Sequence, residues 1–269
     1  MRLGLSSYTY TWAVGVAGHL PPRPLSALDL VDRAASVRVG CVQIADNLPL
    51  DRLSAAEAAA LRAHAAERGV EIEVGARGLT PDRLAAHVDL AAFYGSPILR
   101  FVIDGPGHEP TPDEVIAVIR DGLPRLRAAG VRLALENHDR LEARTFREIV
   151  LGTDERQVGI CLDSVNSMGA AEGLAEVVAA LAPLTINLHL KDFTVERVSH
   201  KMGFVVSGAP AGQGRLRIPW LLGEVSRHGR CQSAILELWT PPGDSIEATI
   251  EREARWADSS LRFLKPLFA

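Results

Sequence analysis

The sequence has few cysteines. Its 269 residues include three, Cys41, Cys161 and Cys231, which lie far apart and show no CxxC spacing. An odd number of widely separated thiols argues against a disulfide framework and against a thiolate zinc site. Two of the three stand within apolar runs, CVQIA and VGICLD, so we expect these thiols to be small buried hydrophobic groups.

Long apolar runs and a large excess of one charge are also missing. No stretch approaches the roughly 18 residues of a membrane span, and the start MRLGLSSYTYTW lacks the apolar core and cleavage site of a signal peptide. The net charge of −4 gives no general attraction to nucleic acid or to an anionic membrane. We therefore expect a cytoplasmic protein that binds neither nucleic acid nor a membrane. Association of the chain into a homo-oligomer is compatible with the sequence.

The sequence does contain short aliphatic runs that alternate with longer segments of helical periodicity. The runs number eight and read RLGLSS, CVQIAD, VEIEVGAR, ILRFVID, VRLALEN, VGICLDS, INLHLKD and SAILELW. Thr80 and Thr111, each followed by proline, mark helix starts between them. This alternation predicts an α/β fold, a single (β/α)8 TIM barrel, and the lack of a linker places residues 1–269 in one domain.

Ligand-type side chains stand at the ends of four consecutive runs. They are Glu136, Asp163, His189 and Glu237. Each alone has a structural explanation, such as a helix cap, a core histidine or an arginine partner. The carboxyl ends of barrel strands open onto one face, however, and three carboxylates crowded there would repel one another without a cation. One imidazole and carboxylate oxygens suit a divalent ion, so the pattern predicts a metal site built from all four residues.

At these residues the sequence also resembles a known family. The segments LALENHD, GICLDSVNS, LHLKDF and ILELW, in that order, resemble the sugar phosphate isomerase/epimerase family of xylose isomerase-like TIM barrels, which includes ketose 3-epimerases and inosose isomerases and dehydratases. The resemblance implies one divalent metal ion, Mn2+ before Mg2+ or Co2+, on the same four residues. It also implies that Glu136 and Glu237 are the catalytic acid/base pair on opposite sides of a sugar or cyclitol substrate.

The metal site predicts enolisation better than it predicts the product. Our leading hypothesis is a metal-dependent isomerase or epimerase of carbohydrate metabolism that acts on a keto-sugar or cyclitol through a metal-stabilised enediolate. The alternative is a metal-dependent lyase or dehydratase acting on a 3-keto-glycoside or inosose. A nucleic-acid enzyme of the same fold would need further histidine ligands, and IADN, VGAR and FVID at the ends of the second to fourth runs contain none.

Further residues are candidates for binding the substrate. Asn166 stands three positions after Asp163, where the epimerases have a histidine, while His138 and Lys191 follow two of the metal ligands by two positions. Arg197 lies near the place of an epimerase arginine, although its spacing matches poorly and a solvated arginine is the simpler interpretation. His200 belongs to the segment RVSHKMGFVVSGAPAGQGRLRIPW, which we expect to form a glycine-hinged loop over the mouth of the barrel. Because no G-x-G-x-x-G follows a strand there, a dinucleotide site is disfavoured.

Overall fold

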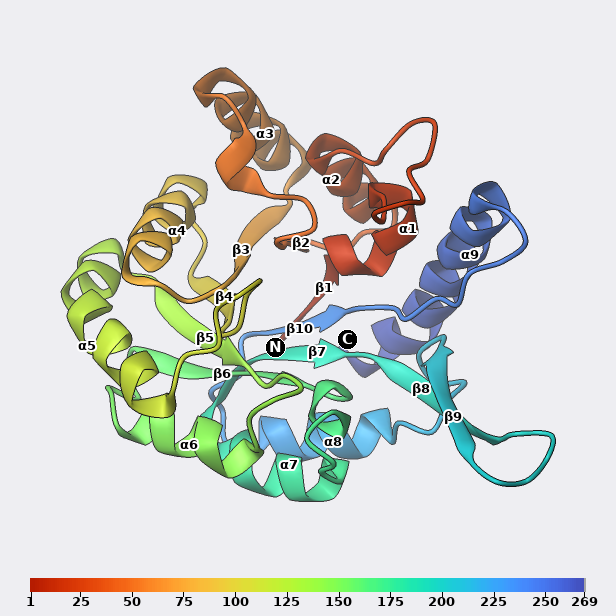
Figure 1. Ribbon diagram of the computed structural model, residues 1–269. Helices are drawn as coiled ribbons and strands as arrows, with labels where there is room; N and C mark the ends of the chain where they lie inside the picture. Colours follow the sequence, from red (N-terminus) through yellow and green to blue (C-terminus); the bar gives the residue numbers. More distant parts are fainter. Residues whose placement is uncertain (269) are drawn as a thin grey trace.

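Eight parallel strands close into a barrel in the computed structural model, which describes residues 1–268, so that Ala269 of the expected domain lies outside the described residues. The strand order around the barrel is β1-β10-β7-β6-β5-β4-β3-β2 (Figure 1). The strands are β1 (Arg2–Ser6), β2 (Cys41–Ile44), β3 (Glu71–Arg77), β4 (Ile98–Val102), β5 (Arg132–Glu136), β6 (Val158–Asp163), β7 (Thr185–Leu190) and β10 (Ser233–Leu236).

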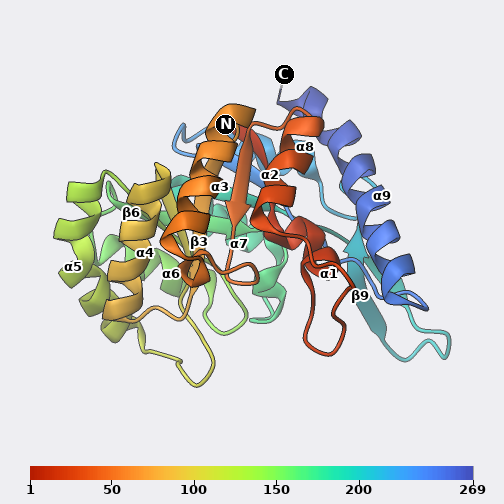
Figure 2. The same ribbon diagram turned by 90° about the horizontal axis from the view of Figure 1, so that it is seen from above.

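Helices surround this barrel, and each barrel strand is followed by one of them before the next barrel strand begins (Figures 1 and 2). The predicted (β/α)8 fold is therefore confirmed. The α-helices are α1 (Thr11–Val14), α2 (Ala27–Ser36), α3 (Ala55–Arg68), α4 (Pro81–Tyr94), α5 (Pro112–Ala129), α6 (Ala143–Leu151), α7 (Leu174–Leu181), α8 (Ile218–Ser226) and α9 (Ile246–Leu264). Single 3-10 turns are η1 (Ser7–Tyr10), η2 (Leu50–Arg52), η3 (Asn166–Met168), η4 (Ala182–Leu184) and η5 (Lys265–Leu267).

Local sequence signals explain where the helices begin and end. The side chain of Thr111 accepts a hydrogen bond from the backbone N–H of Glu114, and Pro112 occupies the first turn of α5, where its missing N–H costs nothing. Gly130 ends α5 with φ of 66°, a left-handed conformation that side chains disfavour. The Thr–Pro starts expected from the sequence are thus confirmed. Among the described residues, no helix combines the length and apolarity needed to cross a bilayer.

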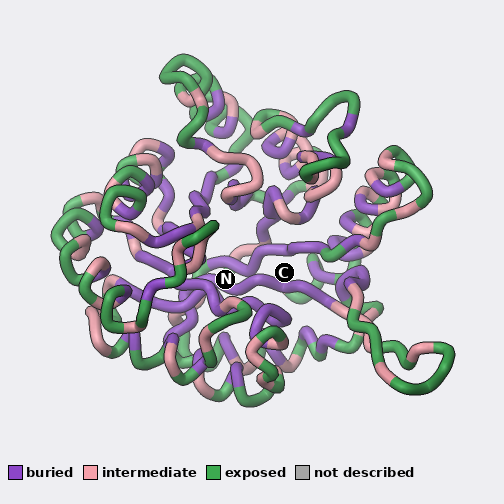
Figure 3. The backbone as a smooth tube through the Cα atoms, viewed as in Figure 1, coloured by how far each residue is buried: buried purple, intermediate pink, exposed green. Residues whose placement is uncertain are grey.

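The barrel strands are buried almost throughout, while the helices bury only their inward faces (Figure 3). Aliphatic side chains pack between strands and helices, and Phe101 and Phe146 are among the largest fully buried side chains. The barrel interior is different because it holds many polar groups. Glu73, Gln43 and Asn187 are all fully buried there, below the four predicted metal ligands. This polar interior positions the candidate site.

The segment between Phe193 and Ile218 is not the irregular loop expected from its glycines. It contains an antiparallel hairpin of β8 (Asp192–Arg197) and β9 (Phe204–Ala209), which projects from the edge of the barrel (Figures 1 and 2). Our prediction of a loop was wrong because FTVER and FVVS contain the aromatic and β-branched residues that favour strands.

The glycines in β9 and just after it permit close packing of the backbone. The Asp192 carboxylate accepts hydrogen bonds from the backbone N–H groups of Gly212, Gly214 and Leu216 at 2.9, 3.0 and 2.9 Å. A Cβ atom on Gly214 would lie 2.2 Å from Asp192 Oδ1, and one on Gly208 would lie 2.0 Å from the carbonyl oxygen of Trp239. The Asp192 carboxylate therefore satisfies the backbone N–H groups of this glycine-rich segment.

Candidate functional site

The four predicted metal ligands meet at the carboxyl end of the barrel. Asp163 and His189 are paired residues of β6 and β7, Glu136 ends β5, and Glu237 follows β10. His189 Nδ1 lies 3.6 Å from Glu136 Oε2, 3.6 Å from Asp163 Oδ2 and 3.5 Å from Glu237 Oε1. All four side chains are nearly or completely buried. One nitrogen thus faces three different carboxylates at distances too long for hydrogen bonds.

This arrangement fits a divalent cation. His189 Nδ1 is buried and has no hydrogen-bond partner among the described residues, which is unusual for a buried polar atom. One ligand atom from each of Asp163, His189 and Glu237 falls within 4.8 Å of the others. Three carboxylates and one imidazole form a donor set that magnesium, manganese and zinc accept in proteins. The residues present could therefore hold one ion, with His189 Nδ1 among its ligands.

Lys191 brings a protein cation to the same carboxylates. Its Nζ atom lies 2.9 Å from Asp163 Oδ2 and 3.0 Å from Glu237 Oε2. Burial opposes the charge on Lys191, but Asp163 and Glu237 outweigh it and raise the lysine pKa. Burial likewise opposes the charge on Asp163, yet Lys191 and His189 lower the pKa of this carboxyl group. Asp163 is therefore ionised, and Lys191 stays protonated.

Asp163 serves two structural roles through its two oxygens. Oδ1 accepts hydrogen bonds from the backbone N–H groups of Val165 and Asn166 at 2.8 and 2.9 Å, which caps η3. Oδ2 points toward His189 and Lys191. Asp163 can therefore cap η3 through Oδ1 and still offer Oδ2 as a metal ligand.

Arg100 on β4 is a site residue that the sequence analysis missed. It is 3% exposed, and its Nε donates to Glu136 Oε2 while Nη1 donates to Asp46 Oδ1 at 3.1 Å. Burial opposes its charge, but Glu136 and Asp46 raise its pKa. The sequence signal for Arg100 as a site residue was an arginine in the middle of the apolar run ILRFV. A buried strand keeps such a charge only beside acidic partners.

A cavity of about 520 Å³ opens above the cluster. Arg100, Glu136, Lys191 and Glu237 form its floor, and Trp12 and Trp239 are among the residues of its wall. The ring of Trp239 lies 5.5 Å from Lys191 Nζ, close enough for a cation–π contact. The cavity therefore offers a charged base and aromatic walls to a small polar ligand.

Three predicted substrate-binding residues line this cavity, namely Lys191, Asn166 and His138. Asn166 Nδ2 donates to Glu136 Oε1 at 2.8 Å, so its side chain already orients one of the predicted ligands. His138 Nε2 accepts from Arg77 Nη2 at 3.1 Å. Arg77, at the end of β3, was not predicted, and its Nε is buried without a hydrogen-bond partner.

The structure does not bring Arg197 or His200 to the cavity. Arg197 ends β8, donates to the carbonyl oxygen of Lys201 and stacks on the ring of Phe204. His200 lies exposed in the turn of the hairpin and accepts from the backbone N–H of Met202. Both residues belong to a hairpin that extends away from the barrel axis, as Figure 1 shows. Their predicted contacts with substrate have no support in this geometry.

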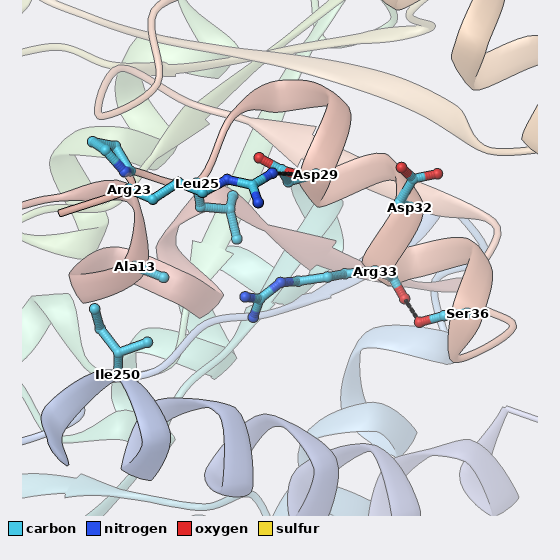
Figure 4. A pocket seen from close by; sticks show the side chains of 9 residues that line it. Ala13, Arg23, Leu25, Asp29, Asp32, Arg33, Ser36 and Ile250 are labelled. Carbon is cyan, nitrogen blue, oxygen red and sulfur yellow. Dashed lines mark hydrogen bonds and ion pairs between the residues drawn. The ribbon is translucent and has the colours of Figure 1, made fainter. Parts of the chain in front are cut away.

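A second cavity, of about 470 Å³, lies on the outside of the barrel between α1, α2 and α9 (Figure 4). Its charged side chains include Arg23 and Asp29, which lie 3.4 Å apart, and Arg33, which stacks on the ring of Tyr10. These charged groups already have partners in the protein, and they lie away from the strand ends. The barrel mouth is the better candidate for chemistry.

Comparison with known proteins identifies the family of this chain. A family model described as xylose isomerase-like TIM barrel matches residues 31–267. The 3-oxo-isoapionate decarboxylase of Pectobacterium atrosepticum is 33% identical over 264 residues, which cover 98% of this chain and 95% of the relative.

Two solved structures share the fold. The D-psicose 3-epimerase of Clostridium cellulolyticum H10 has a TM-score of 0.70 at 16% identity and covers 98% of both chains. A xylose isomerase-like barrel from Mycobacterium smegmatis in complex with magnesium has a TM-score of 0.70 at 15% identity and covers 97% of both chains. By its sequence and its fold, this chain belongs to the xylose isomerase-like TIM barrel family of enzymes.

Proposed function

We propose that the chain is a divalent-metal-dependent enzyme that decarboxylates a small 3-oxo sugar acid. Glu136, Asp163, His189 and Glu237 would hold the ion. A divalent ion in this position supplies a Lewis acid that polarises a substrate carbonyl group. The relative that decarboxylates 3-oxo-isoapionate supports this class of substrate.

The chemistry of a 3-oxo acid determines what the protein must supply. The bond between the carboxylate carbon and its neighbour breaks, the electron pair moves toward the carbonyl oxygen, and carbon dioxide leaves. The resulting enolate then needs one proton on the carbon that lost the carboxylate. The protein must therefore bind the acid end, exclude water and deliver a single proton.

The observation that carries this proposal is a difference between the two glutamates. Glu237 Oε2 lies 3.0 Å from the ammonium group of Lys191, whose raised pKa keeps it protonated at rest, so that only a strongly basic enolate carbon takes its proton. Glu136 instead binds the guanidinium group of Arg100 and the amide of Asn166, and neither releases a proton under ordinary conditions. The Glu237 side of the cavity thus has a proton carrier, and the Glu136 side has none. This arrangement suits decarboxylation, which needs a single proton.

A metal-dependent sugar isomerase or epimerase is the second candidate. Glu136 and Glu237 both line the cavity, as the acid/base pair of a ketose epimerase would. Epimerisation requires a carboxylate to remove a proton on one face and another group to return one on the opposite face. Both oxygens of each glutamate have partners, since Ser6 Oγ donates to Glu237 Oε1 at 3.0 Å. What weakens this candidate is that neither partner of Glu136 releases a proton.

The two candidates differ in a direct experiment. Protein stripped with a chelator and reloaded with Mn2+, Mg2+ or Co2+ is incubated in D2O with a 3-oxo sugar acid and, separately, with ketoses and inososes, and products are followed by NMR. We expect carbon dioxide release and one deuterium per product molecule from the acid. Epimerised, deuterated ketose without reaction of the acid would overturn the proposal.

Paired variants extend this test. We expect Glu237→Gln to lower decarboxylation more than Glu136→Gln at equal metal content, because Glu237 holds the Lys191 ammonium group that donates the proton, whereas Glu136 contacts no group that releases one. Metal content is measured by elemental analysis in each variant, because both residues are also candidate ligands. Equal loss of turnover in two fully loaded variants would favour the epimerase.

A further inference from the structure

A hydrogen-bonded network lies directly beneath the metal ligands, inside the barrel. Its centre is Glu73 of β3, which is fully buried, and Gln43, Asn187 and Ser233 surround its carboxylate. Glu73 Oε2 accepts from Gln43 Nε2 at 3.1 Å and from Asn187 Nδ2 at 3.2 Å, and Oε1 accepts from Ser233 Oγ at 2.6 Å. Every group around Glu73 is therefore a donor.

The network determines the orientation of the Gln43 amide. Its Nε2 group has two hydrogens, which are directed to Glu73 Oε2 at 3.1 Å and to Asn187 Oδ1 at 3.0 Å. The remaining amide atom, Oε1, lies 2.7 Å from His189 Nε2. A reversed amide would point its NH2 group at His189 and would place its oxygen against Glu73 Oε2, which already accepts from Asn187 Nδ2 at 3.2 Å.

The orientation of this amide in turn selects the tautomer of His189. An amide oxygen only accepts, so His189 Nε2 must carry a hydrogen. In the neutral ring the other nitrogen, Nδ1, then has a free lone pair. Nδ1 is the atom that faces the three carboxylates and has no hydrogen-bond partner among the described residues.

We propose that Glu73 and Gln43 are positioning residues that hold His189 in the Nε2–H tautomer and so prepare Nδ1 to bind the metal ion. This inference rests on the metal site of the proposed function. Neither residue touches the cavity, and both act through the orientation of one imidazole ring. Groups that orient a metal-bound histidine in this way typically contribute about 10- to 100-fold to metal affinity.

The first test needs no substitution. The protein is labelled with 15N-histidine, and NMR correlations between ring nitrogens and ring carbon-bound protons distinguish the two tautomers of a neutral imidazole. Metal-free protein is studied at a pH high enough to neutralise the His189 ring. We expect the Nε2–H form, and the Nδ1–H form would overturn the inference outright.

The second test changes the network without changing its size. Glu73→Gln removes an acceptor and introduces an NH2 group, which allows the Gln43 amide to reverse. We expect the Mn2+ dissociation constant, measured by titration calorimetry, to rise about 10- to 100-fold and the Nδ1–H tautomer to appear. Glu71→Gln is the matched control, because Glu71 lies on the same strand with an exposed side chain that contacts Arg2.

A third variant guards against misfolding of the second. Gln43→Met removes the acceptor of His189 Nε2. In this variant the buried Glu73 carboxylate keeps its hydrogen bonds from Asn187 and Ser233. We expect the same loss of metal affinity. Folded variants that bind Mn2+ as tightly as the wild type would contradict the inference, whereas wild-type protein that binds no divalent ion would contradict the proposed metal site itself.

Discussion

At the scale of single residues, Arg77 is the side chain best placed to recognise an acidic substrate. It lines the cavity, its Nη2 donates to His138 Nε2 at 3.1 Å, and its Nε lies 3.6 Å from Asp46 Oδ2 without a hydrogen bond. A guanidinium group with free donors binds a carboxylate in a fixed geometry. Under the proposed function, we expect the Arg77 guanidinium group to bind the acid group of a 3-oxo acid in this cavity.

Arg77→Gln tests this role. We expect KM for a 3-oxo acid to rise about 10- to 100-fold, since a hydrogen bond to a charged group contributes about 1.5–3 kcal/mol. The kcat value should change less, because the proton carrier remains. Arg125→Gln, which alters a pair with Asp89 on the helical surface, is the control. An unchanged KM for the acid would contradict the assignment.

The residues of the cluster differed in how far the sequence could predict them. Glu136, Asp163, His189 and Glu237 could be found because a barrel strand places its last inward residue at a known face. Arg100 lies in the middle of β4 and Asp46 follows β2, so the contacts of Arg100 with Glu136 and with Asp46 required the folded barrel. Contacts between distant strands depend on the register and on side-chain conformations that the sequence pattern does not specify.

At the scale of elements, Asp192 holds the β8–β9 hairpin against the barrel. Its carboxylate is 2% exposed and accepts four backbone N–H groups, including those of Gly212 and Gly214. The glycine-rich segment can approach it because it has no Cβ atoms at the closest positions. The short turn after β9 is thus rigid through hydrogen bonding, despite its composition.

Asp192→Ala should loosen this element. We expect the free energy of unfolding to fall by about 2–4 kcal/mol, because several backbone donors lose a buried acceptor. Thermal unfolding measures the loss, and limited proteolysis should show earlier cleavage near the hairpin. Asp121→Ala, on the exposed side of α5, is the comparison. A hairpin as resistant to protease as in the wild type would show that Asp192 does not anchor it.

The hairpin also shows where element prediction from sequence fails. The alternation of apolar runs identified the barrel strands because burial on both faces gives continuous aliphatic segments. β9 has exposed apolar residues instead, with Phe204 at 60% and Val205 at 53% exposed. Glycines on either side of this short run favoured a loop, and only the pairing with β8 distinguishes the two.

At the scale of the whole molecule, Glu253 joins the two ends of the fold. It lies on α9, is fully buried, and accepts hydrogen bonds at 3.0 Å from the backbone N–H groups of Trp12 and Ala13. Burial raises its pKa to about 7, although the two backbone hydrogen bonds oppose this. The last helix of the barrel is thereby tied to α1, which carries Trp12 in the cavity wall.

The pKa of Glu253 predicts a dependence of stability on pH. An unfolded glutamate titrates near pH 4.3, so between this pH and about 7 the folded state retains a proton that the unfolded state has lost. The stability contributed by this proton is complete below the unfolded pKa and is lost as pH rises through the folded pKa.

We expect the stability difference between wild type and Glu253→Gln to change by about 2–3 kcal/mol between roughly pH 5 and pH 8, with the wild type losing more. Denaturant unfolding at both pH values measures it, and the variant serves as the control for all other titrating groups. Parallel pH profiles in the two proteins would contradict the prediction.

The expectation that residues 1–269 form one domain stays a prediction.

The polar interior of the barrel has a consequence for protein engineering. TIM barrels usually fill this space with branched aliphatic side chains, and replacing buried polar networks by such residues is often neutral or stabilising. Here a redesign of Glu73, Gln43 and Asn187 would raise heat resistance at the expense of the imidazole that the network orients. Thermostable versions should therefore be sought on the outer helices, where Pro124 interrupts the hydrogen bonding of α5 and lies far from the strand ends.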